Sequence, residues 1–479
     1  MNEVINLFSQ LSRIPRESGK EQAVSDWIKN WAEERGLQVT QDDIWNLTIC
    51  KPASAGYEDH PPVMMQAHID MVCEKNSDST HDFATDPIEF TYDGDWLTSA
   101  NGTTLGADNG VGVAAAMAIL DDDALAHPPL EMVFTVQEET TFDGAATVDI
   151  SGLKAMRLIN LDHADERELI VGSCGGVGVR MTMPLERKTA FLAREATASE
   201  NLSAWRIKLT GLKGGHSGED IHRGRGNAIS LLLRVLEEPA LKVVSITGGT
   251  NRLAIPREAE AVVLADEAAL IDVIDNAKAT FRKAYAGAAP DLDLTYEAAG
   301  DESAAQPPLT ESAFAKIAAA VRLYPNGIVN MNGNLEGLVE SSDNIGIIST
   351  EGDVLTLTSE VRGAYQSTVD DIVKTIEILA AVLGAETEYF SAYVPWEFAA
   401  DSELRAAAVQ LHEEMFGREI KQLAIHAGLE CGFFAEKRPG IDIISIGPDC
   451  QYFHSPQERV SVSSIARFYE FLKELLRRL

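Results

Sequence analysis

The stretch Asn101–Leu120, NGTTLGADNGVGVAAAMAIL, is a glycine-rich loop that runs directly into an apolar helical segment. It lies between two short apolar runs that are typical of buried strands, Val63–Gln66 and Leu130–Val136. A further apolar run follows at Arg157–Leu161, and a similar run occurs near the C-terminus at Ile441–Ile446. Strands that alternate with helices in this way indicate an α/β fold built on a parallel sheet.

The middle of the chain has a different pattern, with β-α-β-β-α-β units from about residue 198 to about residue 396. Two passages, Asn251–Ala298 and Asn344–Val394, share their element order and suggest two related halves. We therefore predict a catalytic domain formed by residues 1–196 plus 400–479 and an inserted α+β domain at residues 197–399. Three consecutive domains are the alternative. The insertion is preferred because the flanking pieces are alike and share one set of candidate site residues.

Composition excludes several classes of partner. Of the 479 residues, 74 are Asp or Glu and 40 are Lys or Arg, which gives a net charge of −34. Such a surface repels phosphate backbones and anionic lipids, so we expect neither nucleic-acid nor membrane binding. No apolar run approaches the roughly 20 residues of a membrane span, and the N-terminus lacks the apolar stretch of a signal peptide. Five cysteines without a CxxC pair indicate reduced thiols and a cytoplasmic location.

Acidic and imidazole side chains stand where the predicted strands of the outer pieces end. Because the carboxyl ends of parallel strands meet at one edge of a sheet, these side chains are expected to lie together. They are His68 and Asp70 after Val63–Gln66, Asp108 at the start of the apolar helix, Glu138 and Glu139 after Leu130–Val136, Asp162 after Arg157–Leu161, and His454 after Ile441–Ile446.

These residue types suit a pair of divalent metal ions. Imidazole and carboxylate are zinc ligands that need no thiolate partner. Two ions about 3.5–4 Å apart require a bridging carboxylate and two further ligands each. Asp108 is the candidate bridge, which leaves His68, Glu139, Asp162 and His454 to be divided between the ions. Zn²⁺ is the first expectation, and Co²⁺ and Mn²⁺ suit similar ligands.

Two carboxylates are left for other roles. Glu138 is expected to be the general base that activates the attacking water and then passes the proton to the leaving amine. Asp70 is placed to hold the second ring nitrogen of His68. Each residue alone has an ordinary explanation as a turn or surface residue, and only the combination predicts a metal-assisted hydrolase.

Seven motifs together resemble the aminoacyl-histidine dipeptidases, also called Xaa-His or cytosolic non-specific dipeptidases, of the di-zinc aminoacylase/carboxypeptidase-like superfamily. The resemblance covers essentially the whole chain and keeps the order of the motifs. They are QAHIDMV (Gln66–Val72), TLGADNGVG (Thr104–Gly112), QEET (Gln137–Thr140), NLDHADE (Asn160–Glu166), GGHSG (Gly214–Gly218), HAGLECG (His426–Gly432) and FHSP (Phe453–Pro456).

The resemblance implies a zinc-exopeptidase-like three-layer catalytic domain with an inserted lid or dimerisation domain. We expect a cytoplasmic homodimer, and a monomer is the alternative if the two halves of the lid act within one chain. It implies zinc-dependent hydrolysis of dipeptides, preferentially Xaa-His and including carnosine-type β-alanyl-histidine. It also supports a division of the site roles: Asp108 as the bridge, His68 and Asp162 on one zinc, Glu139 and His454 on the other, Glu138 as the base and Asp70 as the partner of His68.

The same resemblance implies roles for residues outside the metal cluster. His216 in GGHSG would donate to the tetrahedral oxyanion, either within its own chain or from a second subunit. Arg362 in TSEVRG would hold the carboxylate of the substrate, which its planar guanidinium suits. His426, Gly428 and Glu430 in HAGLECG would line the pocket.

Two other functions share this ligand set. One is a related amidohydrolase that removes an acyl group from an amino acid. The other is a non-catalytic metal-binding or peptide-binding relative. A panel of dipeptides and N-acetyl amino acids separates the three.

Overall fold

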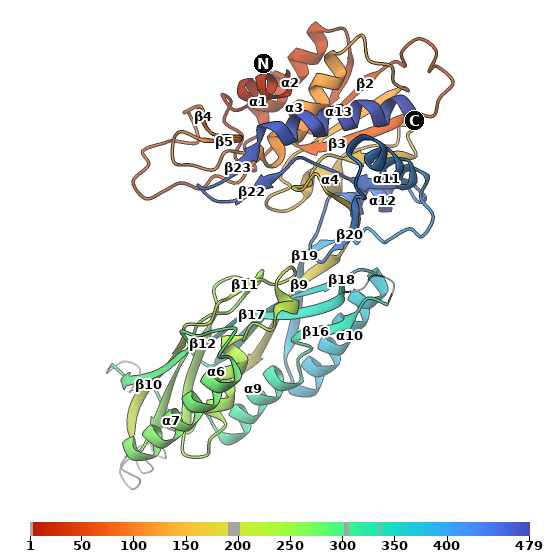
Figure 1. Ribbon diagram of the computed structural model, residues 1–479. Helices are drawn as coiled ribbons and strands as arrows, with labels where there is room; N and C mark the ends of the chain where they lie inside the picture. Colours follow the sequence, from red (N-terminus) through yellow and green to blue (C-terminus); the bar gives the residue numbers. More distant parts are fainter. Residues whose placement is uncertain (1–2, 190–201, 301–305, 334, 336) are drawn as a thin grey trace. The chain divides into compact units, whose positions relative to one another are not determined.

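The computed structural model describes residues 3–189, 202–300, 306–333, 335 and 337–479 (Figure 1). The chain divides into two compact units. Unit 1 comprises Met1–Ser173, Trp396–Ala424 and Leu429–Leu479, and unit 2 comprises Cys174–Pro395 and Ile425–Gly428. The domain boundary predicted between residues 196 and 197 lies outside the described residues.

Unit 1 is built on an 8-stranded sheet whose central strands are parallel. Met65 pairs with Met132 on one side and with Ile159 on the other, which fixes the register of the three strands that precede the predicted site. The strands, in spatial order, are β1 (Gln38–Gln41), β2 (Leu47–Lys51), β6 (Leu130–Thr135), β3 (Val63–His68), β7 (Arg157–Asn160), β21 (Asp442–Ser445), β8 (Glu168–Ser173) and β20 (Lys421–Ile425).

Every residue of β3 and β6 is buried, as expected for parallel strands that are covered on both faces. Val63, Met65 and Ala67 join one large core with α1, α3, α11 and α13. On the opposite face, Gln66 contacts Glu430 at the start of α12. Unit 1 is therefore a three-layer α/β structure. Its helices are α1 (Glu3–Leu11), α2 (Gln22–Glu34), α3 (Ala107–Asp121), α4 (Asp143–Thr147), α11 (Glu403–Phe416), α12 (Cys431–Lys437) and α13 (Val462–Arg478).

A small antiparallel sheet of 4 strands also belongs to unit 1. It joins a hairpin that precedes α3 to a hairpin that precedes α13, so it brings the C-terminal motif FHSP into the same unit as the Asp108 loop (Figure 1). Its strands, in spatial order, are β22 (Cys450–Gln451), β23 (Arg459–Ser461), β5 (Trp96–Ser99) and β4 (Phe90–Asp93).

Unit 2 contains a 9-stranded sheet in which all the described pairs are antiparallel. The strands, in spatial order, are β15 (Asp293–Ala298), β10 (Ser203–Thr210), β14 (Ala259–Ala265), β12 (Lys242–Gly248), β17 (Val339–Glu351), β18 (Val354–Gly363), β9 (Gly175–Pro184) and β19 (Glu386–Tyr393), with β16 (Gly327–Met331) paired to β17.

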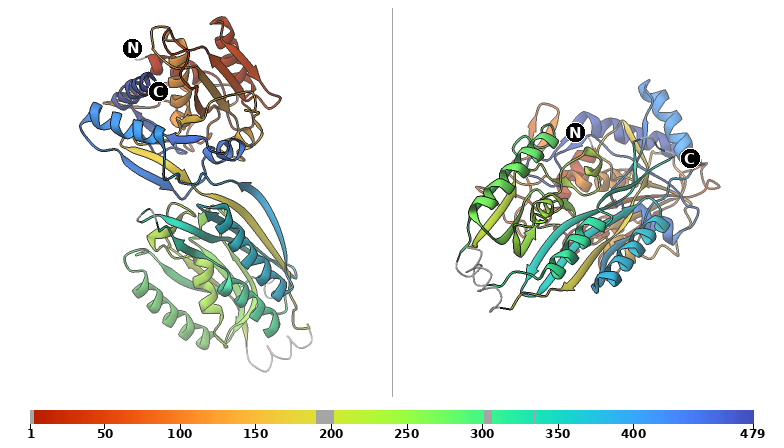
Figure 2. Two further views of the ribbon diagram at one scale, coloured as in Figure 1. Left: turned by 90° about the vertical axis from the view of Figure 1, so that its right-hand side faces the viewer. Right: turned by 90° about the horizontal axis from the view of Figure 1, so that it is seen from below.

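The helices of unit 2 cover one face of this sheet and share one core with it (Figures 1 and 2). They are α6 (Ala228–Leu236), α7 (Glu267–Ala284), α9 (Glu311–Leu323) and α10 (Gln366–Leu383). A two-residue pairing of β11 (Gly215–His216) with β13 (Ala254–Ile255) and the short helix η1 (Ile221–Arg223) complete the unit.

The sheet of unit 2 is arranged as two similar halves about the neighbouring strands β12 and β17. Outward from this centre run β14, β10 and β15 on one side and β18, β9 and β19 on the other. Helix α7 connects β14 to β15, and α10 connects β18 to β19. The α/β class predicted from the sequence is confirmed. Among the described residues, none of the helices combines the length and the apolar character needed to cross a membrane.

Candidate metal centre

The predicted ligands of unit 1 lie at the carboxyl ends of its parallel strands. His68 is the last residue of β3, and Asp162 follows β7 by two residues. Glu138 and Glu139 lie in the turn after β6. Because β6, β3 and β7 are parallel neighbours, their carboxyl ends share one edge of the sheet, where loops form open sites.

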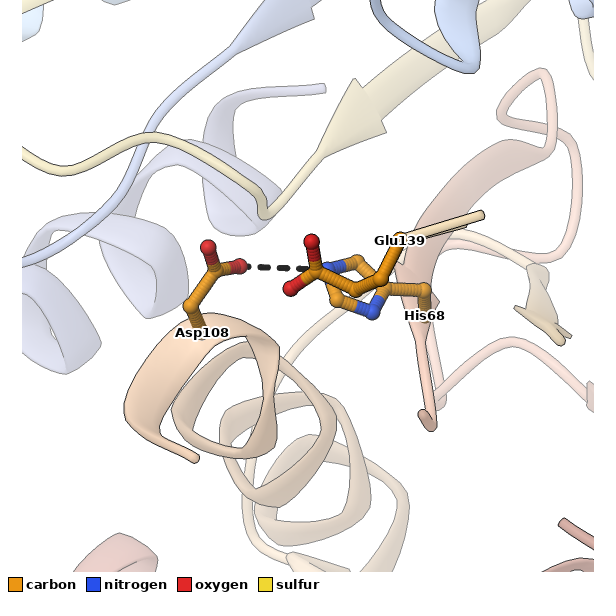
Figure 3. Close-up of side chains that lie close together, drawn as sticks. All are labelled: His68, Asp108 and Glu139. Atoms are coloured by element: carbon orange, nitrogen blue, oxygen red, sulfur yellow. Dashed lines mark hydrogen bonds and ion pairs between the residues drawn. The ribbon is translucent and has the colours of Figure 1, made fainter. Parts of the chain in front are cut away.

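Asp108 lies between two imidazoles. Its Oδ1 is 3.1 Å from Nε2 of His68, and its Oδ2 is 3.2 Å from Nε2 of His454. Asp108 is the second residue of α3, and Figure 3 shows its carboxylate facing His68 at the end of β3. His454 has a φ of 60° in the turn between β22 and β23. A carboxylate whose two oxygens face two different ligands has the arrangement of a bridging group.

Each imidazole has a second carboxylate beside it. Nε2 of His68 is 3.4 Å from Oδ1 of Asp162, and Nε2 of His454 is 2.9 Å from Oε2 of Glu139. The cluster thus consists of two imidazole–carboxylate pairs that share Asp108. Ligand atoms of His68, Asp108 and Glu139 all lie within 4.8 Å of one another (Figure 3).

Asp70 is fully buried and contacts three segments of the site. Its Oδ1 is 3.3 Å from Nδ1 of His68. The backbone N–H groups of Glu138 and Glu139 donate to its two oxygens, each over 3.2 Å, and the hydroxyl of Ser18 donates over 2.6 Å. Asp70 therefore holds the turn that carries Glu138 and Glu139 as well as the ring of His68.

Glu138 lies beside the shared cluster, with Oε2 at 4.0 Å from Nε2 of His68. Burial raises the pKa of its carboxyl well above the ordinary value, and the nearby carboxylates of Glu139 and Asp162 add to this effect. A carboxyl with a raised pKa binds a proton more readily, which suits a general base that later acts as an acid.

The cluster concentrates negative charge in a buried place. Burial, together with the charge of Asp108, raises the pKa of Asp162 to about 6 and that of Glu139 to about 7. Burial opposes the charged form of His68, yet Asp162 and Asp108 hold its pKa well above the ordinary value. Protons are thus drawn to a site where carboxylates outnumber imidazoles.

These residues fit a pair of divalent metal ions. Five carboxyl groups and two imidazoles converge, and cations would offset the repulsion among the carboxylates better than the two rings do. The donor atoms are oxygen and imidazole nitrogen, which Zn²⁺, Co²⁺ and Mn²⁺ all accept. The carboxylates are Asp70, Asp108, Glu138, Glu139 and Asp162, and the imidazoles are His68 and His454.

His216 belongs to unit 2, where it ends β11. Its Nδ1 accepts the backbone N–H of Glu219 over 3.0 Å and that of Gly218 over 3.3 Å. Because Nδ1 is an acceptor, the neutral ring carries its proton on Nε2. The loop therefore selects the tautomer in which Nε2 is a donor.

Arg362 is buried in unit 2, near the end of β18. One Nη donates to the hydroxyl of Tyr393 over 2.6 Å, and the other donates to Oγ of Ser217 over 3.3 Å. Its Nε is buried and forms no hydrogen bond in the described part of the chain. Ser217 directly follows His216, so the guanidinium contacts the GGHSG loop.

His426 and Gly428 lie in the short segment that unit 2 takes from the C-terminal part of the chain. Nε2 of the buried His426 is 2.7 Å from Oγ of Ser342. Burial lowers the pKa of His426 to about 3, and the charge of Arg362 contributes to this lowering. His426 is therefore a neutral ring beside a buried cation. Gly428 is partly buried in the turn after β20.

Glu430 belongs to unit 1 and is completely buried. Its Oε2 accepts the hydroxyl of Thr135 over 2.7 Å and the amide of Gln66 over 2.5 Å. Gln66 in turn accepts from Asn160, whose Oδ1 accepts the backbone N–H of Asp162 over 3.2 Å. This chain of hydrogen bonds links β6, β3 and β7 on the face of the sheet opposite the large core. It ends at Asp162, a candidate ligand.

Two buried ionisable residues beside the cluster, Arg16 and Glu458, did not emerge from the sequence. Arg16 follows a proline in a polar segment, and Glu458 stands among polar residues after FHSP, so neither position carries a pattern. Both contact the backbone around Asp108.

Comparisons with known proteins agree with this architecture. The sequence profile of peptidase family M20/M25/M40 matches residues 64–478. The cytosol non-specific dipeptidase of Escherichia coli (strain K12) is 36% identical over 480 residues, which cover 98% of this chain and 96% of the relative.

Solved structures are similar to this chain over nearly its whole length. The aminoacylhistidine dipeptidase from Vibrio alginolyticus is 34% identical, with a TM-score of 0.86 over 100% of this chain and 96% of that chain. An aminopeptidase from Bacillus cereus, at 16% identity and a TM-score of 0.61 over 99% and 97% of the two chains, shares the fold. With a profile match over most of its length and relatives above 30% identity across nearly all of it, the chain belongs to peptidase family M20/M25/M40, a family of hydrolases.

Proposed function

We propose that this protein hydrolyses unblocked dipeptides at a centre of two divalent metal ions, preferentially dipeptides with C-terminal histidine and including carnosine-type β-alanyl-histidine. The observation that carries the proposal is the carboxylate of Asp108, whose two oxygens face the imidazoles of His68 and His454 at 3.1 and 3.2 Å. The substrate class is supported by the relatives from Escherichia coli and Vibrio alginolyticus, a cytosol non-specific dipeptidase and an aminoacylhistidine dipeptidase.

In this proposal His68 and Asp162 would hold one ion, Glu139 and His454 would hold the other, and Asp108 would be shared by both. Zn²⁺ is the first expectation, with Co²⁺ or Mn²⁺ as alternatives. Such ions, when bound, polarise the scissile carbonyl and lower the pKa of water. Asp70 keeps Nε2 of His68 directed at the cluster by approaching Nδ1 at 3.3 Å.

Glu138 is the general base and then the general acid. It is largely buried beside the cluster, and its raised pKa lets Oε2 accept a proton from the attacking water. The same carboxyl then returns the proton to the amine that leaves when the peptide bond breaks. The fixed position of its backbone, held by Asp70, restricts where this proton can be delivered.

His216 and Arg362 complete the chemistry in unit 2. The Nε2–H that the loop selects on His216 is a suitable donor to the oxyanion of the tetrahedral intermediate. Arg362 would bind the carboxylate of the substrate as a planar, permanently charged donor. His426, Gly428 and Glu430 would shape the pocket, Glu430 acting from below the sheet through Gln66 rather than by direct contact.

For the domains, we infer that unit 1 is the catalytic part and unit 2 is the inserted lid. Compared with the division predicted from the sequence, residues 1–196 plus 400–479 and residues 197–399, strand β9 moves to the lid because it pairs with β18 and β19. We also infer a cytoplasmic homodimer. The word cytosol in the name of the Escherichia coli relative and the five free cysteines support the location. Exposed apolar side chains in unit 2 support self-association: Leu323, Ile328, Val329, Met331 and Val382, the last 78% exposed.

The test is metal analysis combined with a substrate panel. Protein loaded with Zn²⁺, Co²⁺ or Mn²⁺ is offered Xaa-His dipeptides, β-alanyl-histidine, dipeptides without histidine, and N-acetyl amino acids. We expect two ions per chain and cleavage of the dipeptides, fastest when histidine is C-terminal. Cleavage of N-acetyl amino acids alone would instead establish a deacylase, and peptide binding without cleavage would establish a non-catalytic relative.

A further inference from the structure

We propose that Glu458 and Arg16 are positioning residues that hold the Asp108 loop and thereby set the geometry of the metal centre. The inference rests on the proposed two-metal function and adds to it two residues that contact neither ion nor substrate. It follows from hydrogen bonds that converge on the backbone of residues 105–108 from two sides.

The carboxylate of Glu458 accepts four consecutive backbone N–H groups. Oε2 accepts those of Leu105 and Gly106 over 2.7 and 2.9 Å, and Oε1 accepts those of Ala107 and Asp108 over 2.8 and 3.2 Å. An ionised carboxylate offers about four lone-pair sites, so the four N–H groups of this loop use the whole acceptor capacity of Glu458. The side chain is only 2% exposed, and water therefore does not compete for these bonds.

Arg16 holds the same loop through its carbonyl groups. One Nη donates to the carbonyls of Ile69 and Asp70 over 3.1 and 2.9 Å, and the other donates to the carbonyl of Gly106. The guanidinium therefore joins the segment after His68 to the loop before Asp108. Buried charges are stable only when they are paired and hydrogen-bonded, and the charges of Glu458 and Asp70 act on Arg16 from nearby.

The glycines of the motif LGADNG make room for this guanidinium. A Cβ atom on Gly106 would lie 2.4 Å from Nη2 of Arg16, and one on Gly110 would lie 2.7 Å from the same atom. Gly106 also has a φ of 69°, a conformation that other residues rarely adopt. The glycine spacing thus reflects the approach of Arg16 to the start of α3.

Glu458 also connects the segment of His454 to the segment of Asp108, which are far apart in the sequence. It follows His454 by four residues, and its own backbone N–H donates to the carbonyl of Ser455 over 3.0 Å. The turn that presents His454 is in this way tied to the loop that presents Asp108. A shift of either segment would change the 3.2 Å separation between Oδ2 of Asp108 and Nε2 of His454.

The test compares Glu458→Gln with Glu131→Gln. In Glu458→Gln the new NH₂ group cannot accept, and either orientation of the amide places it against two backbone N–H donors. Glu131 is a matched control because it is also a buried carboxylate of unit 1, at the start of β6, that accepts the backbone N–H groups of Lys154 and Ala155. Zinc affinity is measured by competition with a chromophoric chelator, together with the Co²⁺ absorption spectrum, kcat, KM and the unfolding temperature.

We expect both variants to unfold at a lower temperature than the wild type. Only Glu458→Gln should also lose zinc affinity, by about 10- to 100-fold, as is usual when a partner of a metal ligand is removed. It should change the Co²⁺ spectrum and lower kcat more than it alters KM. Wild-type zinc affinity and kcat in folded Glu458→Gln, or an equal loss of affinity in Glu131→Gln, would overturn the proposal.

If Glu458→Gln does not fold, Glu458→Asp keeps the charge and shortens the side chain by one methylene. We expect the same direction of change in that variant, and wild-type affinity and kcat in it would equally refute the role of Glu458. Failure of the proposed function is seen separately, in the wild type itself, as zinc binding without cleavage of any dipeptide.

Discussion

The backbone N–H of Glu138 donates to Oδ1 of Asp70 over 3.2 Å, so the proposed base is fixed by the carboxylate that also faces His68. Asp70→Asn replaces one acceptor oxygen by a donor and should disturb the ring and the turn together. We expect a fall of about 10- to 100-fold in metal affinity or kcat. Titration with Zn²⁺ measures the metal affinity, and steady-state kinetics on a dipeptide measure kcat.

Asp95→Asn is the control for loss of an acceptor carboxylate of unit 1 outside the cluster. Asp95 is exposed and accepts the hydroxyls of Ser461 and Ser463 and the backbone N–H of Ser463, at the start of α13. This substitution should leave metal affinity unchanged. If Asp70→Asn behaves like Asp95→Asn, the double role of Asp70 is wrong.

Glu138→Gln separates the base from the ligands. The amide has nearly the same shape as the carboxyl but cannot accept the proton of water, so kcat should fall by about 10²- to 10⁴-fold. Metal content, measured by elemental analysis, should stay at two ions per chain because Glu138 is not a proposed ligand. Near-normal turnover in this variant would refute the mechanism.

Metal binding should release protons. Without cations, Asp162 and Glu139 have pKa values raised by burial to about 6 and about 7, so at pH 6 Asp162 is about half protonated and Glu139 is mostly protonated. Ligation requires the ionised carboxylate, and each bound ion must therefore expel protons. Zinc affinity should rise between about pH 6 and about pH 7. Calorimetry at pH 6 in two buffers of different ionisation enthalpy tests this, and a buffer-independent heat would contradict it.

His426 should make the protein less stable in acid. Its pKa is lowered to about 3 by burial and by Arg362, whereas the ring in the unfolded chain takes up a proton near pH 6.5. The unfolded state therefore binds more protons in this window, and stability falls as the pH drops from 6.5 toward 3. Between pH 7 and pH 5 the contribution lost is about 2 kcal/mol.

The comparison of His426→Asn with the wild type isolates this effect. The variant loses the contact with Ser342 at every pH, but its free energy of unfolding in urea should fall less between pH 7 and pH 5. His222→Asn, at an exposed position of η1, serves as the control and should lose as much stability as the wild type. Identical losses in all three proteins would exclude His426 as the source.

Strands β3, β6 and β7 of unit 1 could be predicted because each is a short apolar run with a site residue at or shortly after its end. The prediction of Val63–Gln66 and Leu130–Val136 differs from β3 and β6 by one or two residues at the carboxyl end. Strand β9 is different. Its sequence precedes the middle passage, so reading along the chain places it with the first domain, although it pairs with β18 and β19 of unit 2.

Some residues of the candidate site could likewise be predicted from the sequence, and others could not. Residues that follow strands, such as His68 and Asp162, could be found because parallel topology brings strand ends together. Arg16 and Glu458 could not, because their partners are backbone groups, and a backbone N–H or carbonyl leaves no residue type in the sequence to search for. Only the glycines of LGADNG, which accommodate the guanidinium, give an indirect sign of Arg16.

The place of β9 at the centre of the second half of its sheet has a consequence for synthesis of the protein. Its neighbours β18 and β19 leave the ribosome about 170 and about 200 residues after it, which takes roughly 10 to 40 seconds at ordinary translation rates. During that interval the apolar strand GGVGVRMTMP has neither of its final partners. The nascent chain therefore exposes an unpaired strand while the first half of unit 2 folds, and this is the stage at which a chaperone would protect it from aggregation.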